Sequence, residues 1–462
     1  MIVAIIIGKG TDYVQTYSPY ILLLSALVCL ITARLTTHTP SRLIRVGLRK
    51  SASQIIPAIP TLALIGTLSA TWMFNGVVPT LIDYGLLILN PQLFLFITCI
   101  VCSLVSVMSG SSWTTIATIG VAFLGIGTVM GYSTPWIAGA IISGAYFGDK
   151  VSPLSDTTVL ASSSCGVDLF SHIRYLMFTT VPAMVISLIA FAAIGFFTPL
   201  SAASGAEEII GRLSTVFHIT PWVLVIPALT FVFLALKIGT NLTLALSSVV
   251  GLVGVFVFQP QIVEHLTDGT DGGFLAQAWM AVKLLCTDTS IDTGNELLDS
   301  LVSTGGIAGM MPTIFLVLCA MIFGGAMMGT GMLASITRSV TDSLSSPRNL
   351  VGATVGTGLF LNCTTGDQYL SIIIGSNLYK KIYSRNGLQP RLLSRSIEDS
   401  VSVTSVLIPW NSCGVTQSTV LGVATLAYLP CCLFNLLSPL MTLIMASIGY
   451  RIHHQKLAVS EA

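Results

Sequence analysis

The chain has 462 residues, of which 53% are hydrophobic and 8% are charged, and its formal net charge is +1. A soluble domain carries roughly 25% charged residues, so this chain has too few charges to cover a water-facing surface of its size. These values exclude a soluble protein, and the sequence has no basic, aromatic-interleaved face for nucleic acid. They predict an all-α polytopic membrane protein that forms a single transmembrane domain over residues 1–462.

Apolar segments recur along the chain, and several fall short of the ~20 residues that a full helical span needs. The N-terminal run Met1–Ile7 is shorter still, so we expect either that the chain starts late or that its first segment is only a stub. The short segments flank polar clusters, which indicates broken helices or re-entrant hairpins, because irregular backbone at membrane depth is tolerated only where it lines a cavity. The apolar segments lie at 19–33, 54–74, 91–108, 116–130, 134–147, 175–197, 221–236, 241–258, 305–334, 350–361, 369–379, 401–410 and 418–450.

The first half of the chain contains two polar interruptions. Gly110–Thr115 reads Gly-Ser-Ser-Trp-Thr-Thr between two apolar arms and predicts a polar-tipped hairpin. Gly144–Thr158 carries two aspartates, a lysine and a run of hydroxyls, and its Pro153 removes a helical hydrogen bond, which predicts a broken transmembrane helix. Ionisable groups inside a membrane segment cost about 2.5–3.5 kcal/mol each, so their presence indicates a functional site.

The second half repeats this order. Asn362–Gln368 lies between two apolar arms, and Ile408–Gly414 follows around Pro409 at a spacing similar to that of the first half. Two such halves are typical of a transporter with internal repeats and a binding site at their interface. We therefore predict two inverted repeats, 54–197 and 241–450, each with a re-entrant hairpin and a broken transmembrane helix.

Positively charged loops mark the cytoplasmic side of a membrane protein. Basic residues dominate the loops 34–50 and 380–395 and the C-terminal tail, so we expect these segments to be cytoplasmic and the acidic stretch 260–300 to lie outside. If the segment 76–90 does not cross the membrane, the first hairpin enters from outside and the second from inside. The two repeats are then antiparallel.

The two breaks offer freed carbonyls and hydroxyls, and the first also offers a carboxylate; these hard oxygen ligands suit a small alkali cation. Desolvation disfavours the ionised form of a carboxyl group, so a proton competes with sodium for the same group. We expect Asp156 to be this shared site for sodium and protons, and Asp149 is the second choice. A site that holds either ion but not both gives exchange, which alternating access makes vectorial.

Further candidates lie at the breaks and at the hairpin tips. The additional ion- or proton-binding candidates are Ser152, Ser155, Thr157, Asn411, Ser412 and Asp367. The candidate substrate contacts at the two tips are Ser111, Ser112, Thr114, Thr364 and Thr365.

Lys150, Glu398 and Asp399 are secondary candidates, and each has an ordinary alternative. Asp149 and Lys150 also fit a salt-bridged helix end near the membrane face. Glu398 and Asp399 follow Arg395 at the spacing of a helix-surface ion pair.

Other polar groups receive ordinary roles. His172 and Arg174 fit a loop better than a proton relay. Cys99 and Cys102 form a CxxC in apolar context without a second pair or nearby histidines, so we assign them to packing. The common nucleotide-binding, hydrolase and metalloprotease motifs do not occur in a usable context, and we expect neither an enzyme nor a cofactor.

The motifs together resemble the NhaC family of bacterial sodium/proton antiporters, from about Gly66 to Gly414. The matching segments are Gly110–Thr115, Gly144–Thr158, Gly366–Tyr369, Leu393–Arg395, Glu398–Asp399 and Pro409–Gly414. Two departures concern the second break: Val406 stands where the family usually has a proline, and Ser400–Ser402 where it tends to have Gly-Thr. The second broken helix is therefore expected to be less unwound than in the family.

The resemblance implies a secondary transporter of the bacterial inner membrane that exchanges sodium for protons, with one N-terminal span fewer than usual. Some members resemble the chain equally and exchange sodium and an organic acid for protons and another acid, as in malate/lactate exchange. A sodium-coupled exchanger of organic acids or amino acids is therefore the alternative. A channel is disfavoured, because broken helices in both halves favour gated exchange.

The expected partners follow from this reading. They are membrane lipid, sodium ions, protons and, in the alternative, an organic anion. A homodimer is compatible with the resemblance, and nucleic acid is not expected.

Overall fold

A computed structural model describes residues 12–56, 58–198, 211–236, 238–267, 273–291, 302–333 and 346–452, together with residues 293, 299 and 335. The predicted N-terminal stub Met1–Ile7 lies outside these residues. Helices dominate the described part of the chain, where the only β pairing is an isolated bridge between Thr289 and Thr304. The predicted all-α class is confirmed.

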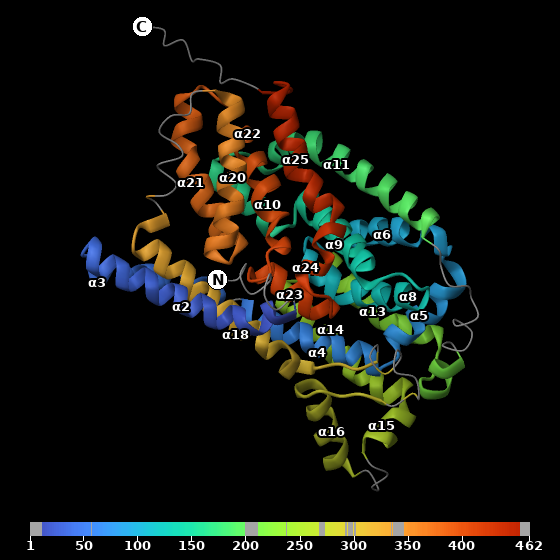
Figure 1. The fold of residues 1–462 in the computed structure, drawn as a ribbon. Helices are drawn as coiled ribbons and strands as arrows, with labels where there is room; N and C mark the ends of the chain where they lie inside the picture. The colour runs from blue at the N-terminus through green and yellow to red at the C-terminus, as the bar shows by residue number, and fades with distance from the viewer. Residues whose placement is uncertain are drawn as a thin grey trace.

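The first half runs through the hairpin and the first break (Figure 1). Its helices are α2 (Asp12–Thr36), α3 (Ser41–Ile55), α4 (Ala58–Phe74), α5 (Val77–Ile88), α6 (Phe94–Ser109), α7 (Ser112–Thr115), the π-helix η2 (Ile116–Gly120), α8 (Val121–Val129), α9 (Thr134–Val151), α10 (Asp156–Cys165) and α11 (Leu169–Phe197).

The remaining elements follow in the same way. They are α13 (Val225–Ala235), α14 (Thr240–Phe258), α15 (Pro260–Leu266), α16 (Phe274–Cys286), α18 (Gly306–Gly329), α20 (Pro347–Thr365), α21 (Gln368–Arg385), α22 (Pro390–Ile397), the π-helix η4 (Glu398–Ser402), the 3-10 turn η5 (Ser405–Leu407), α23 (Ser412–Leu421), α24 (Thr425–Tyr428) and α25 (Leu433–Ser447). Short 3-10 turns η1 (Pro91–Leu93), η3 (Pro221–Leu224) and η6 (Leu429–Cys431) join some of them.

Six helices of the described residues are long and apolar enough to cross a membrane, or up to eight when bent pairs are counted as single spans. One bent pair is α4 and α5, whose axes differ by 63° at a break of few residues. These spans make the chain a multi-pass membrane protein. If α4 and α5 form one bent span, the segment 76–90, which contains α5, does not cross the membrane separately. This is the condition under which the two repeats were predicted to be antiparallel.

Both predicted breaks lie at their prolines. Helix α9 ends at Val151 and α10 begins at Asp156, on either side of Pro153. In the second half, η5 ends at Leu407 and α23 begins at Ser412, on either side of Pro409. Proline has no N–H to donate and clashes with the preceding turn, so each helix stops there.

The two halves also correspond residue by residue around these breaks. One fixed offset along the chain matches three positions of the first half with their counterparts in the second. These positions are the glycine at the hairpin tip, the residue that caps the helix after the break, and the glycine that ends that helix. The pairs are Gly110 with Gly366, Ser155 with Asn411, and Gly166 with Gly422. All four glycines have a positive φ, between +64° and +75°, which a side chain rarely adopts. The element order of the predicted repeats therefore recurs, while their exact limits and their inversion stay predictions.

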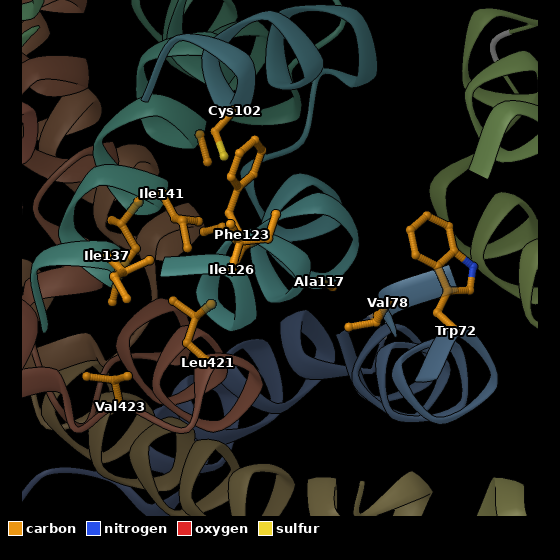
Figure 2. Close-up of a cluster of buried hydrophobic side chains, with 14 of the residues drawn as sticks. Trp72, Val78, Cys102, Ala117, Phe123, Ile126, Ile137, Ile141, Leu421 and Val423 are labelled. Carbon is orange, nitrogen blue, oxygen red and sulfur yellow. The ribbon is translucent and has the colours of Figure 1, made fainter. Parts of the chain in front are cut away.

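The hydrophobic core joins helices that are distant in sequence. Figure 2 shows Phe123 and Ile126 of α8, Ile137 and Ile141 of α9 and Leu421 of α23 among its side chains. All five are buried. Helix α8 packs against both α9 and α23, so burying these side chains holds the two breaks in one body.

The acidic segment lies apart from the C-terminal end. Figure 1 places α15 and α16 at the opposite end of the molecule from the end of α25 and the connection between α21 and α22. This arrangement separates the acidic helices from two of the three basic segments, and the side of the membrane on which each lies stays a prediction. Asp268, Asp271, Asp292 and Glu296 of the acidic stretch lie outside the described residues.

Candidate functional site

The first break places two carboxyl groups at one gap between helices. Ser155 caps α10 by accepting a hydrogen bond from the backbone nitrogen of Thr158 at 3.4 Å, and its hydroxyl lies 3.0 Å from that of Thr157. Asp156 occupies the first turn of α10, where the helix dipole favours an acidic residue. Asp149 lies in the last turn of α9, across the break. The break thus concentrates negative charge.

Two glycines bring α9 close to the first hairpin. A Cβ on Gly144 would lie 2.2 Å from the Cys99 carbonyl oxygen of α6, and one on Gly148 would lie 2.3 Å from that of Ser103. Small residues four apart allow such backbone contact between membrane helices. In addition, Ser106 donates a hydrogen bond of 2.6 Å to the carbonyl of Ala145. The end of α9 is therefore held beside the hairpin tip.

At this tip, Asp149 is bound by Ser112. The Oδ2 atom of Asp149 accepts one hydrogen bond from the backbone nitrogen of Ser112, at 3.1 Å, and another from its hydroxyl, at 2.7 Å. Ser111 caps the short helix behind it and accepts hydrogen bonds from the nitrogen and hydroxyl of Thr114, at 3.2 and 3.1 Å. Ser152 donates to the Val107 carbonyl at 2.8 Å and ties the break to the same hairpin.

A cavity of about 950 Å³ lies between the first break, both hairpin tips and the connection from α13 to α14. Asp156 is exposed in it and Asp149 is half-buried. No lysine, arginine or histidine of the described residues lines this cavity. Its lining residues are Thr61, Ser109, Gly110, Ser111, Trp113, Asp149, Leu154, Asp156, Thr157, Leu160, Leu234, Ile238, Gly239, Thr240, Asn241, Leu242, Gln368 and Tyr369.

The candidates of the second half form a separate buried contact. Asp367 caps α21, accepting a hydrogen bond from the backbone nitrogen of Leu370 at 2.8 Å, and its Oδ2 accepts another from the Ser412 hydroxyl at 3.2 Å. Asn411 caps α23 and donates to the Asn362 carbonyl at 3.2 Å. None of Asp367, Asn411 and Ser412 lines the cavity. They join the second tip to the second break.

The remaining tip hydroxyls of the second half bond within the hairpin. Thr364 donates to the Phe360 carbonyl of its own helix at 2.9 Å. Thr365 lies 2.8 Å from the hydroxyl of Ser371 on the other arm. Of the first-half candidates, Ser111, Asp149, Asp156 and Thr157 line the cavity, whereas Ser112, Thr114, Ser152 and Ser155 do not. The second-half tip contributes Gln368 and Tyr369 to its wall.

Lys150 lies on the other face of α9 from Asp149. Adjacent helix residues point about 100° apart. Lys150 forms a buried salt bridge with Asp399 and donates a hydrogen bond of 2.7 Å to Ser438. The alternative in which Asp149 and Lys150 pair with each other at a helix end near the membrane face is therefore wrong, because Lys150 is 1% exposed and bound to η4 and α25.

The predicted surface ion pair of Arg395 with Glu398 or Asp399 is also wrong. All three side chains are fully buried, and the one salt bridge recorded among the described residues is that of Lys150 with Asp399. The guanidinium of Arg395 instead lies over the ring of Tyr175, 4.8 Å from its centroid. The second half-helix enters the protein interior, so the spacing of a surface pair does not apply there.

His172 is likewise not in a loop. It lies in α11, fully buried, and its Nδ1 atom is 2.8 Å from the hydroxyl of Ser394. The loop prediction failed because α11 begins at Leu169, before the apolar run that marked the segment.

One wall of the cavity was missed by the sequence analysis. Thr240 and Asn241 begin α14 after the connection from α13, and Thr61 of α4 donates a hydrogen bond of 2.6 Å to the Asn241 side chain. The available signal was the polar run Gly239–Asn241 between two apolar segments. Without a third hairpin motif, that run had read as an ordinary connection.

Comparisons with known proteins place these features in context. The model of the Na+/H+ antiporter family matches residues 14–176 and 144–450. The Na+/H+ antiporter NhaC of Alkalihalophilus pseudofirmus is 36% identical over 91% of this chain and 89% of its own length. The Malate-2H+/Na+-lactate antiporter of Bacillus subtilis is 36% identical over 81% of this chain and 77% of its own. The arginine/ornithine antiporter ArcD of Halobacterium salinarum is 36% identical over 88% of this chain and 82% of its own.

Proposed function

Because the chain belongs to the Na+/H+ antiporter family, we propose that it exchanges sodium ions for protons across the bacterial inner membrane by alternating access. The relatives are named as antiporters, and transport without an enzymatic step is the activity that we assign. The sodium ion and the proton are cargo, and no resident cofactor is required.

One observation carries this proposal: two carboxyl groups flank a broken helix in a cavity without a basic residue among its described lining. Asp149 and Asp156 give the cavity a negative charge that favours a cation. The hydroxyl of Ser111 and the lining Thr157 add neutral oxygen atoms nearby. Broken helices at such a position are the usual means by which transporters build an ion site.

Within this site we assign Asp156 as the carboxylate for which sodium and a proton compete. It is the exposed member of the pair, and no hydrogen bond to its side chain is recorded among the described residues. Asp149 already accepts two hydrogen bonds from Ser112, which hold its position. Sodium binding at Asp156 therefore displaces a proton, while Asp149 adds charge from the inner wall.

A sodium-coupled exchanger of organic anions is the second candidate, and one observation favours it. The N-termini of α10, α14 and α21 all reach the cavity, and helix N-termini attract anions. The relative named as a malate/lactate antiporter indicates which class of organic anion such a site would bind. Against it, an anion would meet Asp149 and Asp156, and no lysine or arginine among the described lining residues offsets them.

Everted membrane vesicles test both candidates. A respiratory proton gradient is established, and sodium is added alone or with a panel of malate, lactate, arginine and ornithine. Sodium/proton antiport predicts that sodium alone dissipates the gradient, as recorded by a pH-sensitive dye. No response to sodium alone at any value between about pH 6.5 and 9, with a response once an organic substrate is present, would transfer the assignment to the second candidate.

A further inference from the structure

A second group of buried ionisable side chains lies behind the cavity, on the other face of α9. It includes Lys150, Asp399 and Glu398, which are 1%, 0% and 0% exposed. The two carboxylates are neighbours in the π-helix η4, yet their surroundings differ. π-Helical turns are uncommon and occur often at functional sites.

Asp399 is fully provided with hydrogen-bond donors. It accepts the Lys150 ammonium, the Ser438 hydroxyl at 3.0 Å, the Thr179 hydroxyl at 2.8 Å and the Thr442 hydroxyl. These donors come from α9, α11 and α25. These donors hold the carboxylate in place against Lys150, so the two side chains form a fixed ion pair.

Glu398 is provided with far fewer donors. Neither of its buried carboxylate oxygens accepts a hydrogen bond of normal geometry from a described residue, and the hydroxyl of Ser402, four residues further along η4, is a donor group within its reach. A buried ionised carboxylate without donors is strongly disfavoured, so a group in this position gains by holding a proton. Lys150 is bound to Asp399 and the Arg395 guanidinium lies over the Tyr175 ring, so no ion pair with Glu398 is recorded among the described residues.

The charged and titratable groups around Glu398 come from several elements. Lys150 and Asp149 of α9, Asp399 of η4 and Cys165 of α10 lie within electrostatic reach. His172 of α11 is within reach of the Lys150–Asp399 pair. The other packed helices add neutral groups: Tyr379 and Tyr383 of α21, bonded to Thr357 and Thr354 of α20, and the hydroxyls of α25.

Further buried polar atoms without a recorded partner belong to α11 and α22, which pack against each other. The Nε2 atom of His172 and all three guanidinium nitrogens of Arg395 are buried without a recorded partner among the described residues. Tyr175, beneath Arg395, donates to the backbone carbonyl of Arg451 near the C-terminus. Buried polar groups of this kind are commonly served by internal water, which also conducts protons.

We propose that Glu398 holds a second proton of the transport cycle, separate from the proton that competes with sodium in the cavity. This rests on the proposed exchange of sodium for protons. The carboxylate takes up one proton to become the neutral acid and later returns it, so no other bond changes. A sodium ion in the cavity beside Asp149 adds positive charge within reach of Glu398, favours its ionised form and drives the release of its proton.

The test uses the full chain, purified and reconstituted in liposomes. Radioactive sodium uptake and the pH of the lumen are recorded together, which gives the number of protons moved per sodium ion. The variants are Glu398→Gln, Glu398→Asp and, as a matched control on the exposed face of α15, Glu264→Gln. Sodium self-exchange is measured in parallel, because it needs the cation site and the conformational change but no net proton movement.

We expect Glu398→Gln to move one proton fewer per sodium ion and to lose the acceleration by an imposed membrane potential. Its sodium self-exchange stays within about twofold of the unmodified chain, and Glu398→Asp retains the original ratio. An unchanged ratio and an unchanged response to the potential in Glu398→Gln would overturn the proposal. Loss of sodium self-exchange in a variant that still elutes as a folded protein would overturn it too, since Glu398 would then belong to the cation site or the scaffold.

Failure of the proposed function gives a different pattern. If Asp156→Asn still exchanges sodium for protons, the shared-site assignment falls, while the ratio in Glu398→Gln is still decisive for Glu398. If the unmodified chain requires an organic substrate, the same ratio is measured with that substrate present.

Discussion

Ser112 donates two hydrogen bonds, one from its backbone nitrogen and one from its hydroxyl, to the same oxygen of Asp149. The contact joins the tip of the first hairpin to the end of the first half-helix. The offset that relates the two halves places Gln368 and Ser405 at the corresponding positions, and the Ser405 hydroxyl donates to Gln368 at 3.3 Å. Hydrogen bonds thus join tip to break in both halves, but the carboxylate stands on the break in the first half (Asp149) and on the tip in the second (Asp367).

A second pair of contacts follows the same correspondence. Ser106 donates to the carbonyl of Ala145 in the first half, and Asn362 donates to that of Val401 in the second, at 2.6 and 2.7 Å. Equivalent positions of the two halves therefore form the same contact although their residues differ. The difference in charge between the halves then has a local cause, which is the presence of Asp149 and Asp156 at one break only.

Removing the Ser112 hydroxyl should weaken sodium binding. Ser112→Ala leaves the backbone donor in place but removes a hydrogen bond to an ionised group, which is worth about 1.5–3 kcal/mol. Asp149 then binds a proton more readily, and the sodium concentration for half-maximal exchange should rise by about tenfold. The measurement is a sodium titration of gradient dissipation in vesicles.

The matched control for that change is Ser163→Ala. Ser163 is exposed in α10, and its hydroxyl donates only to the Leu160 carbonyl of its own helix. Its half-maximal sodium concentration should stay within about twofold of the original. Equal shifts in the two variants would show that the Ser112 contact does not act on the cation site.

The hairpin tip itself can be tested through Gly110. Its φ is +65°, and a Cβ added there would lie 2.7 Å from both the carbonyl carbon and the Cβ of Leu154. Gly110→Ala should abolish exchange, because the tip must move away from the break. Gly422→Ala is the control: its φ is +64° and no atom lies within 4 Å, so it bears only the backbone cost of about 1–2 kcal/mol.

Exchange rates and melting temperatures of the two glycine variants show whether transport requires the close contact between the hairpin tip and Leu154. Gly422→Ala should lose a few degrees of melting temperature and keep its transport activity. If Gly110→Ala behaves in the same way, the tip tolerates displacement from Leu154, and the close approach has no role in transport.

The sequence predicted those parts of the molecule that depend on local chemistry. Pro153 and Pro409 end helices because they lack a backbone donor, whatever surrounds them, and both breaks lie where expected. The glycine tips and the recurring order of the halves follow from the same local preferences. The contact between Asp149 and Ser112 at the hairpin tip, by contrast, was not predicted, because it joins segments that the sequence does not place side by side.

Contacts between distant segments were beyond such reasoning. Lys150 and Asp399 are 249 residues apart, and neither sequence neighbourhood indicates the other. Nor did the spacing of Arg395 and Glu398 show that η4 enters the interior, since a three-residue spacing describes buried and exposed helices equally. Which face of a helix is buried depends on the elements that pack against it, here α10, α20, α21 and α25.

The Lys150–Asp399 pair should be costly to break but not to replace. Lys150→Met leaves an ionised Asp399 buried without its cation, a loss of about 3–5 kcal/mol. In the double variant Lys150→Met with Asp399→Asn, the amide oxygen can still accept from Thr179 and Thr442 while the amide nitrogen donates to Ser438, so much of that loss is recovered. Melting in detergent should therefore place the double variant above Lys150→Met.

The single variant Asp399→Asn completes that cycle. It leaves the Lys150 ammonium buried without a carboxylate and should melt below the double variant as well. Additive losses, with the double variant the least stable of the three, would mean that the two charges do not compensate each other.

Neutralising Asp156 should abolish exchange without unfolding the protein. Asp156→Asn keeps the size of the side chain at an exposed position, so the melting temperature should change little, while the negative charge for which sodium and a proton compete is lost. Asp83→Asn is the matched control, because Asp83 is a half-buried carboxylate of α5 that does not line the cavity. Sodium added to vesicles should dissipate the proton gradient with Asp83→Asn and have no effect with Asp156→Asn. If both variants dissipate it equally, Asp149 becomes the remaining carboxylate of the cavity, and Asp149→Asn is then expected to be the inactive variant.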